Sequence, residues 1–130
     1  MKYDKFFMDK PLLYIGACPI FIFEGEKMSV EINVTGEVVT AYLSGELDHH
    51  TAKNMRECID SAVELNSPTL LVLDFSGVSF MDSSGIGLVM GRYRNLQNKG
   101  IALHISGASP TIYKVMKLAG IEKLAKLEGR

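Results

Sequence analysis

The sequence predicts a small α/β domain: a mixed β-sheet that begins with an antiparallel hairpin and continues as parallel βαβ units, with helices packed on it. Three observations support this fold class. The chain has 130 residues, the size of one domain, and 47% of them are hydrophobic. Apolar residues alternate with polar ones early in the domain, as in strands, and later recur three and four apart, as in helices. Strands that alternate with helices form a sheet through right-handed crossovers.

The first 27 residues differ in composition from the rest. They hold six of the eleven aromatic residues, and their longest uncharged run spans positions 11–23. A membrane-spanning helix needs about 20 apolar residues, so we expect no membrane span. We interpret residues 1–27 as an N-terminal extension. It is either an appendage, native or created by the choice of start codon, or an extra strand at Ile20–Phe23. The domain then occupies residues 28–130.

An antiparallel hairpin opens the domain. Its tight turn is Thr35-Gly36-Glu37, and apolar residues alternate with polar ones on both sides of this turn. A period of two places the apolar side chains on one face of each strand. The residues expected on the buried face are Val30, Ile32, Val34, Val39, Ala41 and Leu43.

Three helices are expected after the hairpin, at residues 51–65, 84–98 and 109–120. Asn66-Ser67-Pro68 ends the first, and Ser109-Pro110 starts the third with an N-cap followed by proline. Apolar spacings of three and four define the inward faces. They carry Ala52, Met55, Ile59 and Ala62 in the first helix, Ile86, Val89, Tyr93 and Leu96 in the second, and Ile112, Val115, Met116 and Ala119 in the third.

Two further strands are expected between these helices. Residues 70–75, Leu-Leu-Val-Leu-Asp-Phe, form a run that is apolar except for Asp74, which is typical of a strand covered on both faces in a parallel sheet. Residues 101–105 form the next strand, in which we expect His104 to be a hydrogen-bonded structural residue. One more short element is expected at residues 121–127.

Charge and composition narrow the function. The 14 Lys and Arg residues nearly balance the 15 Asp and Glu residues, which leaves no basic surface for direct nucleic-acid binding. Cys18 and Cys58 form no CxxC motif, so neither a disulfide scaffold nor a structural zinc site is indicated, and a cytoplasmic protein is expected. Met90 breaks the dinucleotide-binding glycine pattern, and no P-loop is present, so we expect no cofactor.

The start of the second helix carries the first candidate site. Asp82, Ser83 and Ser84 are all good N-cap residues, and capping alone would explain them. The functional interpretation is that a serine hydroxyl is exposed here, and that Gly85 and Gly87 leave room for another backbone or a phosphate. A helix N-terminus stabilises an added anion by about 0.3–1 kcal/mol, so a phosphoserine is compatible with the fold.

The loop before the first helix carries the second candidate site, Asp48-His49-His50-Thr51. Adjacent histidines point in different directions, and no third ligand is suitably spaced, so we expect no metal. A catalytic triad of Ser83, His49 and Asp48 would need neighbouring residues to act in line with a distant serine. The simpler interpretation is that Asp48 or Thr51 caps the helix and the histidines are solvated.

Taken together, segments 44–52 and 79–94 resemble the anti-sigma factor antagonist family, in particular its sporulation members. The fold of this family is called the STAS domain, and the resemblance covers residues 29–124. Residues 1–27 have no counterpart in the family. The resemblance also implies that relatives continue past residue 130 through a last strand and a closing helix, so the domain is expected to be shortened at its C-terminus.

The resemblance implies roles for individual residues. Ser83 is expected to be phosphorylated by the partner, an anti-sigma factor that is itself a serine kinase and carries its own adenine nucleotide. Asp48 is expected to help bind this partner, and Asp82, Ser84 and Gly85 to shape the same surface. A serine phosphatase is expected to restore the hydroxyl.

The expected function is therefore regulatory and not enzymatic. The unphosphorylated chain would bind the anti-sigma factor and release the sigma factor, which makes it a positive regulator of sigma-dependent transcription in sporulation. The alternatives are a STAS module of a stress-response or non-sigma system, or a small serine-dependent hydrolase. A hydrolase would need a base beside the Ser83 hydroxyl, and the sequence offers no clear one.

Overall fold

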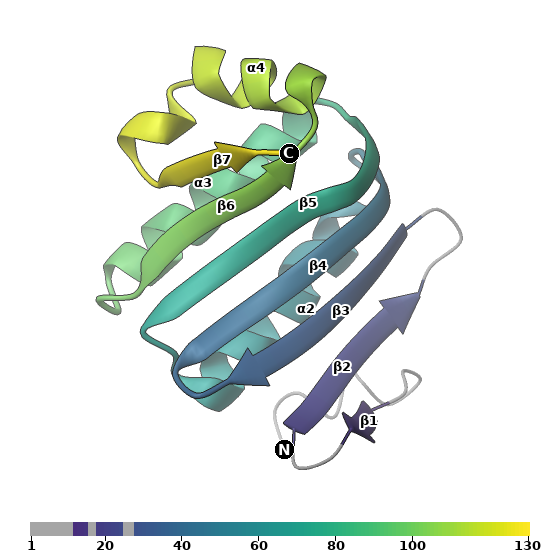
Figure 1. Ribbon diagram of the computed structural model, residues 1–130, viewed down its shortest axis with the longest axis vertical. Helices are drawn as coiled ribbons and strands as arrows, with labels where there is room; N and C mark the ends of the chain where they lie inside the picture. The colour runs from purple at the N-terminus through teal and green to yellow at the C-terminus, as the bar shows by residue number, and fades with distance from the viewer. Residues whose placement is uncertain (1–11, 16–17, 25–27) are drawn as a thin grey trace.

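The computed structural model describes residues 12–15, 18–24 and 28–130, and its described strands form one seven-stranded sheet in chain order (Figure 1). The strands are β1 (Leu12–Ile15), β2 (Cys18–Glu24), β3 (Met28–Thr35), β4 (Val38–Leu47), β5 (Leu70–Met81), β6 (Ala102–Ala108) and β7 (Lys126–Gly129). The helices within the described residues are α2 (Ala52–Asn66), α3 (Ser83–Gln97), α4 (Pro110–Leu118) and the 3-10 helix η1 (Ile121–Lys123).

The strand directions confirm the predicted fold class. Strands β1 to β4 pair antiparallel, and β4 to β7 pair parallel. The predicted hairpin is β3–β4, with Gly36 in its turn at φ 59°. The extra strand considered at Ile20–Phe23 is part of β2, which extends the sheet beyond β3.

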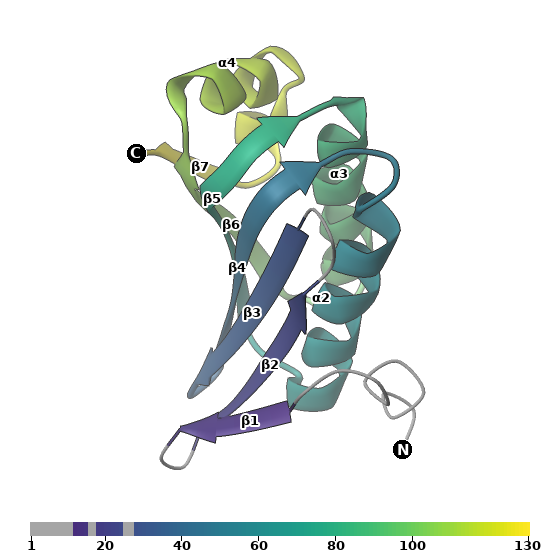
Figure 2. The ribbon, with the colours of Figure 1, turned by 90° about the vertical axis from the view of Figure 1, so that its right-hand side faces the viewer.

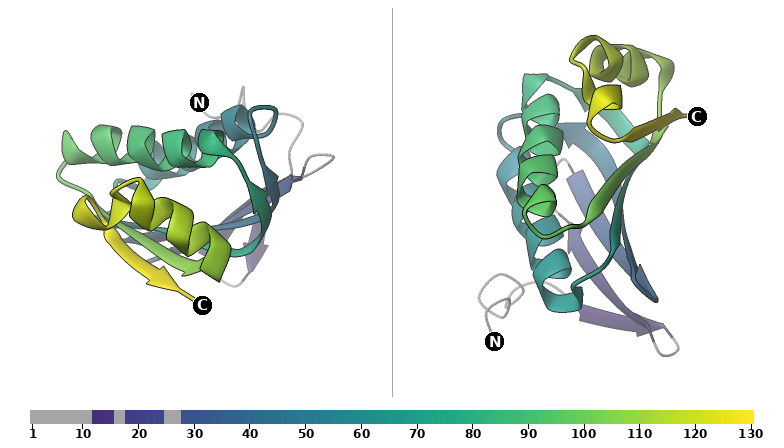
Figure 3. Two further views of the ribbon diagram at one scale, coloured as in Figure 1. Left: turned by 90° about the horizontal axis from the view of Figure 1, so that it is seen from above. Right: turned by 90° about the vertical axis from the view of Figure 1, so that its left-hand side faces the viewer.

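Helices α2 and α3 lie side by side against one face of the sheet, and the opposite face is open (Figures 2 and 3). Both follow a parallel strand, and right-handed crossovers running in one direction place their helices on the same side. This corrects the expectation that residues 70–75 are covered on both faces. Leu71, Leu73 and Phe75 are buried under the helices, whereas Leu70 and Val72 on the open face are only half-buried.

The helix faces follow the predicted pattern with exceptions. In α2 the predicted Met55, Ile59 and Ala62 are buried, but Ala52 is only half-buried. In α3, Leu88 and Arg92 face the core beside Val89 and Leu96, while Ile86 and Tyr93 are half-buried. In α4, Ile112 and Met116 are buried, Ala119 is half-buried and Val115 is 41% exposed, because this short helix packs through a narrow stripe.

The end of the chain also differs from expectation. Gly120 adopts φ 84°, which ends the α4 region and begins η1. The short element expected at residues 121–127 is therefore two elements, η1 and then β7. Because β7 pairs parallel with β6, the chain does contain a strand where a missing last strand was expected. That the relatives continue with a closing helix stays a prediction.

Candidate functional site

The two candidate segments meet at one edge of the sheet, where the parallel strands β4 and β5 end. Leu47 is the register partner of Met81, and the Asp82 N–H donates to the Leu47 carbonyl at 3.1 Å. The loop that leads into α2 and the first turn of α3 are thus neighbours, although more than 30 residues separate them in the sequence. Both helices begin at this edge (Figure 2).

Asp82 is the residue that caps α3. Its backbone is extended, with φ −102° and ψ −167°, and its Oδ1 accepts from the Ser84 N–H at 2.8 Å. The Asp82 carbonyl accepts from the Gly85 N–H at 3.0 Å. Since the aspartate satisfies the free N–H groups of the first turn, capping accounts for only one of the three polar residues that the sequence offered.

Ser83 is the first residue of α3, and its side chain is exposed. Within residues 28–130, no hydrogen bond joins its hydroxyl to a histidine or to a carboxylate. The hydroxyl therefore faces solvent at the positive end of a 15-residue helix, without a structural role of its own. Ser84, its neighbour, is half-buried.

Gly85 is buried and has a packing role. A Cβ at this position would overlap the Met81 side chain and lie 3.2 Å from Leu47 Cδ2. Because Gly85 has no side chain, Met81 can pack against the first turn of α3. Gly85 therefore influences the surface around Ser83 through packing and not through direct exposure. Gly87, one half-turn on, is exposed and has open space around it.

Asp48 organises the loop before α2. Its Oδ1 accepts from the His50 N–H at 2.8 Å and from the Thr51 N–H at 3.1 Å. In return, the Thr51 Oγ1 accepts from the Asp48 N–H at 3.0 Å, and it also donates to the Glu46 carbonyl at 2.8 Å. This exchange resembles a capping box, and it leaves the Asp48 side chain only 12% exposed. Thr51 is the N-cap residue of α2, but its side chain makes no capping hydrogen bond. The prediction that Asp48 or Thr51 caps the helix is therefore corrected: the two side chains hold the turn before α2, and the backbone carbonyl of Asp48 accepts from the Ala52 N–H at 2.9 Å.

The histidine pair is exposed and does not form the triad that the sequence raised. The rings of His49 and His50 lie 3.8 Å apart between centroids, and His50 Nδ1 is 3.7 Å from Asp48 Oδ1. It is His50, not His49, that lies next to the aspartate. Across the part of the chain that the structure describes, no group of three His, Cys, Asp or Glu side chains could hold a metal ion.

A half-buried ion pair joins α3 to α2, and sequence reasoning missed it. Arg92 Nε lies 2.8 Å from Asp60 Oδ1, with the arginine side chain only 9% exposed. Burial lowers the pKa of Arg92 and raises that of Asp60, and the opposite charge of the partner opposes each shift. The available signal was position: Arg92 is four residues before Leu96 on the same helix face.

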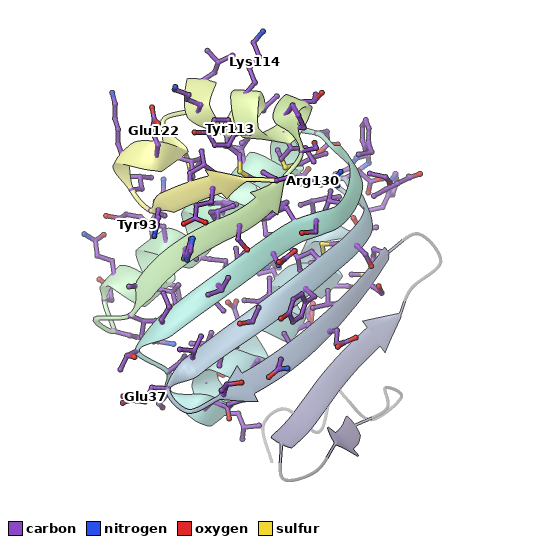
Figure 4. The ribbon with its side chains drawn as sticks, viewed as in Figure 1. Glu37, Tyr93, Tyr113, Lys114, Glu122 and Arg130 are labelled. Atoms are coloured by element: carbon purple, nitrogen blue, oxygen red, sulfur yellow. The ribbon has the colours of Figure 1, made fainter. Side chains whose placement is uncertain are left out.

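The open face of the sheet is polar around β6 and β7 (Figure 4). His104 Nε2 lies 3.4 Å from Glu128 Oε1, and Lys126 Nζ lies 3.1 Å from the same oxygen. The hydrogen bond and charge of Lys126 lower the pKa of Glu128. His104 Nε2 thus lies near a carboxylate oxygen without forming the hydrogen bond that was expected for it. No helix among the described residues has the length and apolarity to cross a membrane.

Family and sequence comparisons match this architecture to known proteins. The family model described as STAS domain matches residues 29–129. The anti-sigma F factor antagonist of Lysinibacillus sphaericus is 41% identical over 68% of this chain and 75% of its own length. The anti-sigma F factor antagonist of Paenibacillus polymyxa is 32% identical over 75% of this chain and 83% of its own length.

Solved structures give the same picture. The anti-sigma factor antagonist SpoIIAA in its unphosphorylated form is 37% identical and superimposes with a TM-score of 0.65, covering 77% of this chain and 86% of that chain. The Bacillus cell fate determinant SpoIIAA in the phosphorylated form, also 37% identical, superimposes with a TM-score of 0.61, covering 77% and 89%.

Proposed function

Because this chain belongs to the STAS domain family, we propose that it is an anti-sigma factor antagonist whose binding is switched by phosphorylation of Ser83. The unmodified chain binds an anti-sigma factor, a serine kinase that carries its own adenine nucleotide, and thereby releases the sigma factor. Phosphorylated on Ser83, the chain lets the kinase go. The names of the relatives support a role in sigma factor regulation, and those named for sigma F favour sporulation.

The observation that carries the proposal is the exposed Ser83 hydroxyl at the start of α3. A kinase can reach it without unfolding the helix, since Asp82 keeps the cap. A phosphate adds about −1.5 to −2 charges at neutral pH. The dipole of the helix N-terminus stabilises such an anion by about 0.3–1 kcal/mol. The modified chain therefore keeps its fold.

The switch acts at the binding surface. In a complex, a phosphate on Ser83 would be buried beside the Asp82 carboxylate, and like charges brought together in an interface cost several kcal/mol. A loss of about 3 kcal/mol weakens binding more than a hundredfold. The similarity of this chain to SpoIIAA in both phosphorylation states supports a switch that leaves the fold in place.

The remaining residues of the site have supporting roles in this proposal. Asp48 holds the loop before α2 in shape and offers its carboxylate to the partner from a mostly covered position. Asp82 and Ser84 lie on the contact surface, and Gly85 shapes it by admitting Met81 beneath it. A serine phosphatase returns Ser83 to its hydroxyl form. Both reactions take place in the cytoplasm.

Incubation of the chain with the anti-sigma factor of the same organism and ATP, followed by mass mapping, tests the proposal. One phosphate is expected on Ser83. The matched control is Ser84→Ala, which keeps Ser83 and should still be phosphorylated, whereas Ser83→Ala should bind the kinase and accept no phosphate. Phosphate on another residue, or on none, would overturn the mechanism.

A second candidate is an antagonist in a stress-response sigma system. Anti-sigma-B factor antagonists of Listeria monocytogenes and Staphylococcus aureus share 23% and 25% identity with this chain. Measured affinities for purified anti-sigma F and anti-sigma B factors would separate the two systems. We infer no hydrolase activity, because a nucleophilic serine needs an adjacent base. An esterase screen is therefore expected to detect no activity.

A further inference from the structure

Phe80 is exposed where the strand pattern predicts a buried residue. Val78 is 2% exposed and faces the core, so simple alternation along β5 would place Ser79 outside and Phe80 inside. Instead, Phe80 is 51% exposed. Full burial of a large aromatic side chain contributes roughly 1.5–3 kcal/mol, and Phe80 gains only about half of this.

A β-bulge causes this exposure. Gly45 is the register partner of Val78, but the next residue of β4, Glu46, is the partner of Phe80, so Ser79 is an extra residue in β5. One inserted residue exchanges the faces of the side chains that follow it. Without the bulge, Phe80 would be opposite Leu47 and would face the core. With it, Met81 takes the inward place.

The bulge therefore has two effects beside Ser83. It sends Met81 inward, where its side chain covers Gly85, and it sends Phe80 outward. Phe80 is two residues before the Asp82 cap, at the same edge of the sheet as the Asp48 loop. The other large apolar side chains that are exposed within residues 28–130 are Tyr42, Leu65, Val115, Leu118 and Leu124. Of these, only Tyr42 lies on β4 or β5.

We propose that Phe80 is the aromatic anchor of the docking surface and enters an apolar pocket on the anti-sigma factor. This inference rests on the proposed function and deepens it. Aromatic side chains near the centre of an interface commonly supply most of the binding energy, while the polar residues around them set orientation. Phe80 supplies affinity, and the neighbouring Ser83 supplies the switch. Continuity with the surface formed by Asp82 and Ser84 identifies the anti-sigma factor as the occupant.

Phe80→Ala tests the anchor in the full chain with unmodified Ser83. We expect affinity for the purified anti-sigma factor, measured by calorimetry with its adenine nucleotide present, to fall at least about tenfold. Phe80→Leu keeps much of the apolar area, so its affinity should lie between those of the wild type and Phe80→Ala. Leu65→Ala is the matched control, because Leu65 is 39% exposed at the far end of α2. Its affinity should stay within about twofold of the wild type.

Kinetics separate anchoring from a structural effect. With Phe80→Ala, the KM of the kinase for the chain should rise while kcat for Ser83 phosphorylation stays unchanged, and the melting temperature should stay within about 3 °C. If the wild type binds and Phe80→Ala binds equally well, only the anchor is refuted. If the wild type does not bind the anti-sigma factor at all, both this inference and the proposed function are refuted.

Discussion

The two loops at the carboxyl edge of the sheet carry equally recognisable motifs but are built in opposite ways. In the loop before α2, Asp48 and Thr51 exchange hydrogen bonds and are both buried. In the first turn of α3, Asp82 takes over the capping, which leaves Ser83 exposed. In the first loop the polar side chains hydrogen-bond within the loop, whereas the second loop leaves the Ser83 hydroxyl available to a partner. Residues of the first loop should thus affect folding, and Ser83 should affect binding.

The largest expected effect is on binding at Ser83. Phosphorylated chain should bind the anti-sigma factor more than about a hundredfold less tightly than unmodified chain, because the added charge would be buried beside Asp82. Ser83→Asp should weaken binding less, since a carboxylate carries less charge than a phosphate. Titration of the three forms against the same kinase measures the series. Equal affinity of the phosphorylated and unmodified forms would contradict it.

Gly85→Ala should destabilise the domain by up to about 2 kcal/mol, because the new methyl group overlaps Met81. Overpacking costs about 1–3 kcal/mol, and the better helix propensity of alanine offsets up to about 1 kcal/mol of this. Gly87→Ala is its matched control. Gly87 has open space around it, and alanine in a helix is better than glycine by up to about 1 kcal/mol, so this variant should be more stable than the wild type. Urea unfolding of both variants checks the opposite signs. Equal destabilisation would show that the first turn of α3 is less tightly packed than described.

Asp48→Ala should lower the free energy of unfolding by about 1–2 kcal/mol, because it removes the acceptor for two backbone N–H groups. Asp48→Asn keeps an acceptor oxygen and should lose less. If Asp48 also binds the partner through its charge, the asparagine variant should bind more weakly while staying nearly as stable. If a variant loses stability and affinity in proportion, Asp48 has only a structural role and does not bind the partner directly.

The smallest expected effect is on the stability of Ser83→Ala. Since Asp82 caps the helix and the Ser83 hydroxyl is exposed, the free energy of unfolding should change by no more than about 0.5 kcal/mol. Chemical unfolding at neutral pH measures this. A loss of 1 kcal/mol or more, as is typical of a deleted cap, would show that Ser83 has a structural role and would remove the contrast between the loops.

Sequence patterns predicted the elements wherever one physical requirement dominated. The hairpin β3–β4 and the helix α2 follow from strict apolar periodicity, and their buried residues largely match. The strand β5 continues to Met81, six residues beyond its predicted end. The prediction ended too early because Ser76, Gly77 and Ser79 interrupt the apolar pattern on which it relied. Backbone pairing with β4 holds this polar stretch in the sheet.

The sequence singled out the residues of the candidate site but not their structural roles. The N-cap pattern could not tell which of Asp82, Ser83 and Ser84 accepts the hydrogen bond, since all three have a suitable side-chain oxygen. The inward position of Arg92 depends on Asp60 from another helix, and the outward position of Phe80 depends on a bulge. Both are tertiary effects that a periodic pattern does not encode.

The order of the strands in space, which equals their order in the chain, has a consequence for biosynthesis. Each strand borders only its immediate predecessor and successor, so a nascent chain leaving the ribosome can add strands one at a time to a growing edge. No early strand has to wait unpaired for a late one to be inserted beside it. The surface that carries Ser83 is complete in sequence once α3 has emerged, while α4 and β7 are still to be made.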